Sequence, residues 1–511
     1  MDRRKFVKSS GAVMAVSMIP GLSLAVGKDK IVLGKMGANL PDNPQEGVPY
    51  RIYDCFLDLT GDYPVPIAPK YIEWFERSRL GMFVHWNHSS LVPTEISWAM
   101  YAEKKPGMPM KEYENLAKRF NPVSFNAAEW VRLAQEAGMA HILVVVKHHD
   151  GFAMWDTKVS DYKITNTPFK RDYCAEIAEA CHKAGMRYGF YYSPADWWHT
   201  ASRAADWDGY VGYMQEQLRE LVTSYGDIDM LAMDFWSPAC NHKSWTEFYK
   251  ELRKLAPRTI FSRNTPWAIG DFEVVEHFVP YVRTPGSSEL SNITSNNNFK
   301  SRMNRSALFE TYLSVQQSGW SYNNGSAIPL NKIVNQLVDT AGCGGNLTLN
   351  ITPDSNGKVP PAQVELLQNI GKWMRENGET IIGTSGTHLE PAMVISDQER
   401  QGSEVPVMLG EAGSRPKKSR CVIANTGVGK RLYIHVLDWM GKETISVPIP
   451  GDQLVDCRIK GGGALLTKRM EGEIRITVPE YLHQPMDTII VLELASPVSD
   501  IRINKAPGFL I

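Results

Sequence analysis

The sequence predicts an α/β fold in which a (β/α)8-like barrel is followed by a C-terminal antiparallel β-sandwich. Two observations predict the barrel: from residue 71 short apolar runs alternate with stretches of helical periodicity, and eight such runs can be counted. A third observation predicts the sandwich, because beyond residue 384 short β-rich runs are separated by Gly, Pro and Asp turns. We therefore expect an export signal at 1–27, an extended N-terminal segment at 28–70, the barrel at 71–384 and the sandwich at 385–511.

The balanced charge of the chain limits the classes of function. Among 511 residues, 55 Lys and Arg oppose 56 Asp and Glu, which gives a formal charge of −1. Without a basic excess we expect no nucleic-acid partner. No stretch after the N-terminus approaches 18 apolar residues, so we expect no integral membrane segment. The 7 cysteines are scattered without a C-x-x-C pair, which favours structural thiols over a disulfide framework.

The N-terminus resembles an export signal of the twin-arginine type. Arg3 and Arg4, with Phe6 and Lys8, precede a modest apolar run at 12–25. This run is too short and too interrupted to span a bilayer stably. We therefore expect an exported protein, located in the periplasm or outside the cell.

The elements of the two domains follow in order. Residues 28–70 are rich in Gly, Pro and Asp, and we expect them to wrap the barrel. Barrel strands are predicted at 80–86, 142–146, 186–192, 228–234, 259–263, 272–279, 308–315 and 346–351. Helices are predicted at 74–78, 111–120, 127–137, 174–184, 204–225, 244–255, 330–340 and 362–377. The Ser- and Asn-rich interval 279–306 is predicted to be a long loop at the active face, and sandwich strands are predicted at 420–424, 431–437, 444–449, 472–478 and 488–494.

Polar, titratable residues end the predicted barrel strands. The buried run at 142–146 changes within one residue to Lys147-His148-His149-Asp150. In (β/α)8 barrels the chemistry lies at the C-terminal ends of the strands, although a strand end that simply meets solvent would look the same. The pattern recurs along the chain, and topology would bring one set of strand-end residues around one barrel mouth: His85, His148, His149, Tyr191, Asp234, Arg263 and Glu276.

A metal site is one use of such a cluster. Neighbouring residues on a strand point to opposite faces, so His148 and His149 could ligate one ion only if the strand ends and twists there. The chain has no H-x-H pattern and no H-E-x-x-H helix. We therefore predict no metal and no other cofactor.

Sugar chemistry is the second use. A glycosidase needs one carboxylate as nucleophile or base and another as acid, reaching a sugar ring from separate elements. Asp234 follows an apolar strand, and Glu276 lies beside Val274 and Val275, whose apolar character would raise the pKa of Glu276. Either carboxylate could instead be a structural partner of Arg263. The 14 tryptophans and 20 tyrosines include candidates for stacking on sugar rings, although core packing accounts for most of them.

Several separated motifs resemble one family. They are W-F-x-x-S-R-L-G-M-F-V-H-W at 74–86, K-H-H-D-G-F at 147–152 followed by W-D-T-K-V-S-D-Y at 155–162, G-F-Y-Y-S-x-x-D-W at 189–197, G-D-I-D-M-L at 226–231, G-D-F-x-x-x-E at 270–276, F-E-T-Y-L-S-V-Q-Q-S-G-W-S-Y-N at 309–323 and G-G-N-L-T-L-N-I-T-P-D-x-x-G at 344–357. In this order they resemble the α-L-fucosidases of glycoside hydrolase family 29, across about residues 74–383. That family also has a C-terminal β-sandwich, although the C-terminal domain of this chain carries no assignable motif.

The resemblance implies roles for individual residues. Asp234 matches the nucleophile, and Glu276 matches the acid/base of one branch of the family, with Glu273, His277 and Glu310 as alternatives. Positions that match fucose-binding residues are His85, His148, His149, Tyr191 and Arg263, while Glu95 and Trp98 match a Glu-Trp pair and Trp320 is a candidate wall of the pocket. Ala232 departs from the pattern, because the family usually has a Trp two residues before the nucleophile; Trp236 could replace it in space.

The implied function is that of an exo-acting, retaining α-L-fucosidase that hydrolyses terminal α-L-fucosyl linkages by double displacement. Its partner would be a fucosylated oligosaccharide or glycoconjugate, and homo-oligomerisation stays open. One alternative is a related glycosidase such as an α-L-galactosidase, because Ala232 alters the pocket wall. The other is a non-hydrolytic glycan-binding protein, against which the presence of both candidate carboxylates argues.

Overall fold

The computed structural model describes most of the chain beyond residue 66. The described residues are 67–100, 107–234, 239, 244–263, 270–276, 308–323, 325–386, 392–394 and 420–501. Nearer the N-terminus it describes four short strands that form one sheet: β1 (Val13–Met14), β2 (Leu24–Val26), β3 (Ile31–Leu33) and β4 (Phe56–Leu57). The rest of the predicted export signal and nearly all of the predicted N-terminal segment lie outside the described residues, so the domain division stays a prediction.

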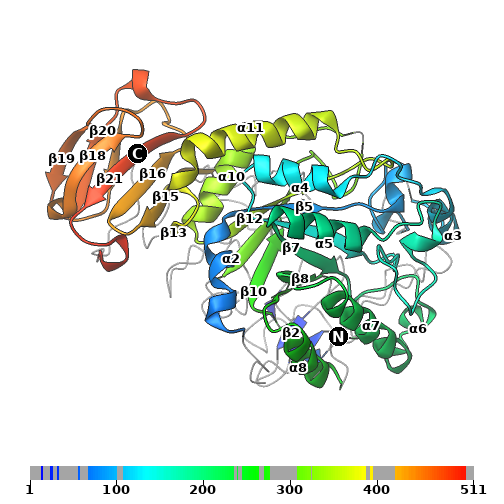
Figure 1. The fold of residues 1–511 in the computed structure, drawn as a ribbon. Helices are drawn as coiled ribbons and strands as arrows, with labels where there is room; N and C mark the ends of the chain where they lie inside the picture. The colour runs from blue at the N-terminus through cyan, green and yellow to red at the C-terminus, as the bar shows by residue number, and fades with distance from the viewer. Residues whose placement is uncertain are drawn as a thin grey trace, which may run out of the picture.

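Eight parallel strands close into a barrel, which confirms the predicted fold class (Figure 1). The strands are β5 (Leu80–Val84), β6 (His141–Lys147), β7 (Arg187–Tyr192), β8 (Met230–Met233), β9 (Ile260–Arg263), β10 (Phe272–Glu276), β11 (Phe309–Ser314) and β12 (Asn346–Ile351). Each strand pairs with the next one in the sequence, and β12 pairs with β5 to close the ring. Each coincides with a run predicted from the sequence.

Alternating side chains along the strands fill two cores. On β5, Met82 and Val84 face the surrounding helices, whereas Phe83 belongs to the cluster inside the barrel with Tyr191. At Gly81 a Cβ atom would lie 2.3 Å from the His141 ring, so only glycine leaves room for that imidazole inside the barrel. The barrel interior is therefore filled with packed side chains, which support the residues at its C-terminal end.

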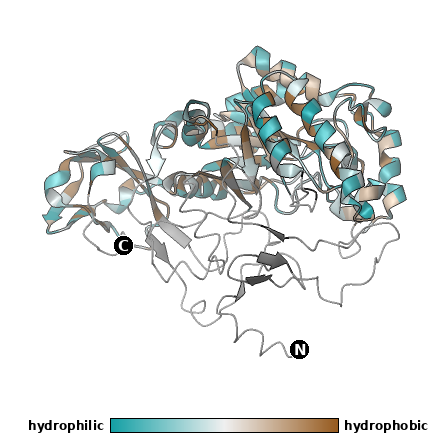
Figure 2. Cartoon of the chain, turned by 90° about the horizontal axis from the view of Figure 1, so that it is seen from below, coloured by the Kyte–Doolittle hydropathy of each residue, from teal (hydrophilic) through white to brown (hydrophobic). Residues whose placement is uncertain are grey.

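Helices surround the barrel. They are α2 (Glu73–Ser78), α3 (Met110–Leu116), α4 (Ala127–Glu136), α5 (Tyr173–Ala184), α6 (Thr200–Arg203), α7 (Trp207–Thr223), α8 (Trp245–Leu255), α10 (Leu330–Gly342) and α11 (Pro361–Asn377). Figure 2 shows hydrophilic residues on their outer faces. Among the residues described, no helix combines the length and apolarity needed to cross a membrane.

The predicted helix at 204–225 corresponds to α7, whereas the short helix α6, which lies before the predicted start, was not predicted. The side chain of Asp206 accepts a hydrogen bond from the Gly209 amide at 3.0 Å and so caps the start of α7. Ala205, directly before this cap, has a φ of 55° and cannot continue a helix. The single helix is confirmed, and it begins slightly later than predicted because helical periodicity alone does not reveal such a cap.

Two antiparallel sheets form the C-terminal region. One contains β13 (Ser385–Gly386), β14 (Ala392–Val394), β15 (Arg420–Val428), β16 (Arg431–Val436), β21 (Thr488–Leu494) and β18 (Leu454–Ile459), and the other contains β17 (Thr444–Val447), β20 (Glu473–Thr477) and β19 (Leu466–Met470). They enclose their own apolar core, and α10 lies between barrel strand β12 and β15. The sequence did not predict β18 and β19, because a bulge interrupts the alternation in β18 and most side chains of β19 are exposed.

Candidate active site

Side chains from successive strands meet at the C-terminal end of the barrel. The ring of His148, directly after β6, has its centroid 5.7 Å from those of His85, after β5, and Tyr191, in β7. Tyr191 in turn donates a hydrogen bond to Asp234, which follows β8. Four neighbouring strands thus bring these predicted site residues together.

Both adjacent histidines take part in this cluster because β6 ends directly before them. The pairing of β6 with β7 shifts register between Val145 and Lys147, and the strand ends at Lys147. The rings of His148 and His149 lie 4.0 Å apart, and ligand atoms of both imidazoles and of Asp234 lie within 4.8 Å of one another. The strand therefore ends and twists in the way that convergence of the two imidazoles requires.

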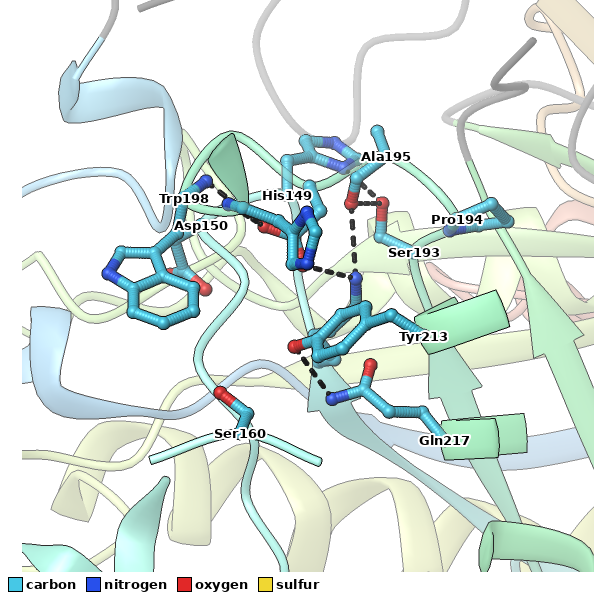
Figure 3. A network of polar contacts seen from close by, with 12 residues as sticks. His149, Asp150, Ser160, Ser193, Pro194, Ala195, Trp198, Tyr213 and Gln217 are labelled. Atoms are coloured by element: carbon cyan, nitrogen blue, oxygen red, sulfur yellow. Dashed lines mark hydrogen bonds and ion pairs between the residues drawn. The ribbon is translucent and has the colours of Figure 1, made fainter. Parts of the chain in front are cut away.

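The tautomer of His149 follows from its partners (Figure 3). Its Nδ1 lies 2.7 Å from the hydroxyl of Ser193, and this hydroxyl donates its proton to the carbonyl of Ala195 at 3.1 Å. The hydroxyl must therefore accept the hydrogen bond from Nδ1–H, which leaves Nε2 as an acceptor. Burial lowers the pKa of His149 well below its usual value, so the ring is neutral.

A buried ion pair supports the segment that holds His149. Lys147 Nζ lies 3.0 Å from Asp196 Oδ2 and 3.3 Å from the Tyr210 hydroxyl, and both charged side chains are fully buried. The second oxygen of Asp196 accepts hydrogen bonds from the backbone amides of Trp198 and His199. The pair thereby fixes the loop that carries Ser193 beneath the imidazole.

His85 is held in the same tautomer. Asn350 Oδ1 accepts hydrogen bonds from the His85 backbone amide at 3.0 Å and lies 2.7 Å from its Nδ1. Since the Asn350 amide nitrogen donates to the carbonyl of Trp320 at 2.8 Å, the orientation of the amide is fixed and His85 carries its proton on Nδ1. Burial lowers the pKa of His85 to about 3, against the opposing effect of Asn350, so this ring is also neutral.

Glu95 fastens the loop of Trp320. The Trp320 backbone amide lies 2.9 Å from each carboxylate oxygen of Glu95. The preceding Gly319 has a φ of +73°, and a Cβ atom there would lie 2.1 Å from Glu95, so the loop needs glycine at this position. The Trp320 ring lies 5.2 Å from His85, while Trp98 meets His149 edge-on at 5.5 Å. The two predicted tryptophans thus border the histidine cluster on opposite sides.

Two buried tyrosines report where the two candidate carboxylates lie. Burial, followed by the charge of Asp234 and more weakly by that of Glu276, holds the pKa of Tyr191 well above its ordinary value. Burial, then Glu310 and then both Asp234 and Glu276, does the same to Tyr312. Glu276 and Tyr312 are also direct partners in the pairing of β10 with β11. Tyr191, which bonds Asp234, and Tyr312, the strand partner of Glu276, both lie against the Phe83 ring, with centroids 5.4 and 4.8 Å away, so the two carboxylates belong to strands that border the same part of the barrel.

Three residues that position the imidazoles were not predicted. Ser193 and Asn350 lie within quoted motifs, where a polar residue one or two positions from the apolar core of a strand was the available signal. Ser97 lies in a loop without periodicity and gave no signal. It has a φ of 58°, its hydroxyl lies 2.6 Å from His148 Nδ1, and it accepts the amide of Asp150 at 2.8 Å. Such a strained backbone is common at functional sites.

Two further residues that the sequence singled out, Glu310 and Ala232, lie inside the barrel below the histidine cluster. The side chain of Glu310 is fully buried and contacts His141 at 3.1 Å, deep inside the barrel. Ala232 is 1% exposed and belongs to the cluster inside the barrel. The structure does not describe the side chains of Arg263 and Glu273, and His277 and Trp236 lie outside the described residues altogether. The roles proposed for these four residues stay predictions.

All the reported similarities to known proteins are to alpha-L-fucosidases. The family model for alpha-L-fucosidase matches residues 67–379. Plasma alpha-L-fucosidase of Rattus norvegicus is 27% identical over 339 residues, which cover 61% of this chain and 70% of that protein. Alpha-L-fucosidase isoenzyme 1 of Paenibacillus thiaminolyticus has the same fold, with a TM-score of 0.67 and 26% identity, over 84% of this chain and 99% of that one. A fucosidase of Bacteroides thetaiotaomicron, solved as a trapped covalent intermediate, matches with a TM-score of 0.65 and 19% identity over 84% and 97%.

Proposed function

The chain belongs to the alpha-L-fucosidase family and is therefore a glycoside hydrolase; on that premise we propose that it removes terminal α-L-fucosyl residues from glycans as an exo-acting, retaining enzyme. The observation that carries the proposal is the hydrogen bond from Tyr191 to Asp234 beside neutral imidazoles, with Glu276 placed on β10 as the strand partner of Tyr312. Two carboxylates from separate strands beside hydrogen-bond acceptors are what hydrolysis of a glycoside requires.

In the first step Asp234 attacks the anomeric carbon of the sugar. The Tyr191 hydroxyl donates a hydrogen bond to this carboxylate. The high pKa of Tyr191 keeps the phenol protonated, so it remains a donor. The hydrogen bond orients the carboxylate, so that the reacting oxygen approaches along a fixed line. We therefore assign Tyr191 to holding the nucleophile, in addition to lining the fucose pocket.

Glu276 acts as the acid and then as the base. It protonates the glycosidic oxygen as the bond to the leaving group breaks, and it then deprotonates the water that hydrolyses the fucosyl-enzyme. A retaining mechanism needs the two carboxyl groups about 5–5.5 Å apart. The covalent intermediate trapped in the Bacteroides thetaiotaomicron fucosidase agrees with this sequence of steps.

The imidazoles recognise hydroxyl groups of the sugar. His85 and His149 each present Nε2 as an acceptor, because their Nδ1 protons are committed to Asn350 and Ser193. Both rings stay neutral, so each Nε2 accepts a hydrogen bond from a sugar hydroxyl, and the rings do not attract anions. Trp320 beside His85 supplies a flat apolar wall. His148, Glu95, Trp98 and Arg263 complete the proposed binding set.

Release of free fucose from a panel of fucosylated oligosaccharides tests the proposal. The first-formed product should be the α-anomer, which a retaining enzyme gives and which proton NMR distinguishes from the β-anomer early in the reaction. Formation of the β-anomer would contradict double displacement. The same panel addresses the natural glycan and its linkage.

Two other functions make different predictions. An α-L-galactosidase would prefer the nitrophenyl α-L-galactoside over the fucoside; the small Ala232 inside the pocket floor favours this alternative. A glycan-binding protein without activity would bind fucosylated glycans and release no fucose.

Export is the second part of the proposal. The paired arginines before the apolar run support a twin-arginine-like signal, which would carry the folded protein to the periplasm or beyond. Replacing Arg3 and Arg4 by lysines should retain the protein in the cytoplasm, as fractionation would show. The oligomeric state can be read from the molar mass of the purified protein in light scattering.

A further inference from the structure

The cluster at the end of β6 has the composition of a transition-metal site. It contributes two imidazoles, from His148 and His149, and one carboxylate, from Asp234, with ligand atoms within 4.8 Å of one another. Two histidines and one carboxylate suit ions such as Zn²⁺ or Cu²⁺, whereas Mg²⁺ and Ca²⁺ prefer oxygen ligands alone. The three side chains follow the ends of two strands, β6 and β8, which lie on either side of β7.

The partners of the two imidazoles agree with this use. Metal-bound histidines usually give their second ring nitrogen to a hydrogen-bond partner, which fixes the ring. Here His149 Nδ1 bonds the hydroxyl of Ser193 at 2.7 Å, and His148 Nδ1 lies 2.6 Å from the hydroxyl of Ser97. In each ring Nε2 is then the nitrogen for a ligand. The two rings, 4.0 Å apart and inclined by 45°, cannot separate without breaking these bonds.

The distances require the ligands to move closer together. Zn²⁺ binds histidine nitrogen and carboxylate oxygen at about 2.0–2.2 Å in a tetrahedral arrangement, so two ligand atoms lie about 3.3–3.6 Å apart. Ligand atoms up to 4.8 Å apart therefore have to approach by up to about 1.2–1.5 Å when the ion binds. Asp234 can supply this movement by rotation of its carboxylate, of which Tyr191 holds one oxygen, because the residue lies just beyond the end of β8 and is half-buried.

We propose that His148, His149 and Asp234 bind one Zn²⁺ or Cu²⁺ ion in the absence of substrate and that this ion inhibits the enzyme in competition with the sugar. The inhibition rests on the proposed function, because the ion occupies the carboxylate that attacks the anomeric carbon. The metal binding itself rests on the ligand geometry alone. The ion is an inhibitor and takes no part in hydrolysis.

Calorimetric titration of the metal-free protein with ZnCl₂ tests the binding. We expect one ion per chain and an affinity at least about tenfold weaker in His149→Gln and in Asp234→Asn. His182→Gln is the matched control, because His182 is exposed on α5 and remote from the cluster, and it should bind Zn²⁺ like the wild type. No binding, or equal affinity in all four proteins, would overturn the site.

A spectroscopic measurement on the unaltered protein covers the case in which a variant fails to fold. With one equivalent of Cu²⁺, the electron paramagnetic resonance spectrum should show coupling to two imidazole nitrogens. Coupling to none, or a spectrum dominated by sulfur ligands, would exclude the proposed ligand set.

Kinetics separate the inference from the proposed function. Zn²⁺ should raise KM for a nitrophenyl fucoside without lowering kcat, a chelator should restore activity, and L-fucose should weaken Zn²⁺ binding in calorimetry. A lower kcat at unchanged KM would contradict competition at this site. If the metal-free protein hydrolyses no fucoside, the proposed function fails, while calorimetry still decides the metal site.

Discussion

The two sides of the barrel mouth are built differently. On the side of β5 to β8, the candidate nucleophile and the imidazoles each contact a named neighbour: Tyr191 holds Asp234, and Ser193 and Asn350 hold two of the rings. These contacts lie within the site itself. The side of β9 and β10, which carries Glu276, depends instead on how two short strands are paired.

The pairing around β9 is brief. Among the described residues, β8 and β9 are partners at Met230↔Ile260 and Leu231↔Phe261, and β9 and β10 are partners at Phe272↔Ser262 and Glu273↔Arg263. By contrast, the register of β6 and β7 extends from His141↔Arg187 to Lys147↔Tyr192. The position of Glu276 is therefore set mainly by the pairing of β10 with β11, which extends from Glu273↔Phe309 to Glu276↔Tyr312, and less by β9.

A buried ion pair at the far end of the barrel compensates for this short pairing. Asp271 Oδ2 accepts hydrogen bonds from Arg253 at 2.6 Å and from the Phe261 backbone amide at 2.8 Å. Arg253 also donates to the carbonyl of Thr259 at 2.6 Å, and both charged side chains are 6% exposed. The pair joins the beginnings of β9 and β10. Asp234 is thus positioned by a local side-chain contact, whereas Glu276 is positioned by the register of its strand.

The largest effect is expected for Asp234→Gly, which removes the locally held carboxylate. Loss of a nucleophile should lower kcat by at least about 10³-fold. Azide should restore turnover by attacking in its place, and the product should then be the inverted fucosyl azide. Wild-type rates in this variant would show that the nucleophile is misassigned.

The next effect tests the nucleophile side. Tyr191→Phe removes one hydrogen bond to a charged group, worth about 1.5–3 kcal/mol, and should lower kcat about 10- to 100-fold. The loss should be similar for fucosides with good and with poor leaving groups. A wild-type kcat would show that Tyr191 does not hold the nucleophile.

A smaller and more selective effect is expected on the other side. Asp271→Asn removes the negative charge that pairs with Arg253, and it should lower the rate several-fold for fucosides with poor leaving groups, which need an acid, but little for activated aryl fucosides. Glu276→Ala is the matched control and should show the same selectivity more strongly, at about 10²- to 10⁴-fold.

Equal losses for both substrate classes in Asp271→Asn would mean that the pair stabilises the barrel without setting the position of Glu276. If Glu276→Ala itself lacks the selectivity, Glu276 is not the acid, and Glu273 becomes the next residue to replace.

The last effect is one of stability and leaves the chemistry unchanged; it concerns the side rich in histidines. Burial lowers the pKa of His85 and of His88 to about 3, from 6.5. The unfolded chain therefore binds more protons than the folded one between these values, so stability falls as the pH drops from 6.5 towards 3, by up to about 1.4 kcal/mol per pH unit and group. Urea midpoints from pH 7 to 4 measure this slope.

His88→Gln offers a control outside the proposed sugar-binding set. It removes one of the titrating groups, so its stability should depend less steeply on pH than that of the wild type. An identical slope in the two proteins would show that His88 does not contribute.

The sequence predicted the barrel well because its signals are local. Each buried strand is a short apolar run between helices, and the polar residue after each run is visible in the sequence, as at His85, His148 and Asp234. Pairing across the barrel is not a local property. The contacts of Asn350 with His85, and of Ser97 with His148, join positions far apart in sequence, so neither could be inferred from spacing.

The same limit explains the errors. The start of α7, slightly later than predicted, depends on a side-chain cap, and the missed strands β18 and β19 lack the alternation that reveals a strand. Glu310 is not such an error, because the sequence placed it in a structural motif and kept it only as a fallback for the acid/base. Its full burial against His141 places it in the floor.

Labelling with 2-deoxy-2-fluoro-fucosyl fluoride tests the central claim most directly. This substrate analogue should form a slowly hydrolysed fucosyl-enzyme, and peptide mass spectrometry locates the modified residue. Our account predicts one label per chain, carried by Asp234 and absent from Asp234→Gly. A label on Glu276 or Glu310, or rapid turnover with no label at all, would contradict it.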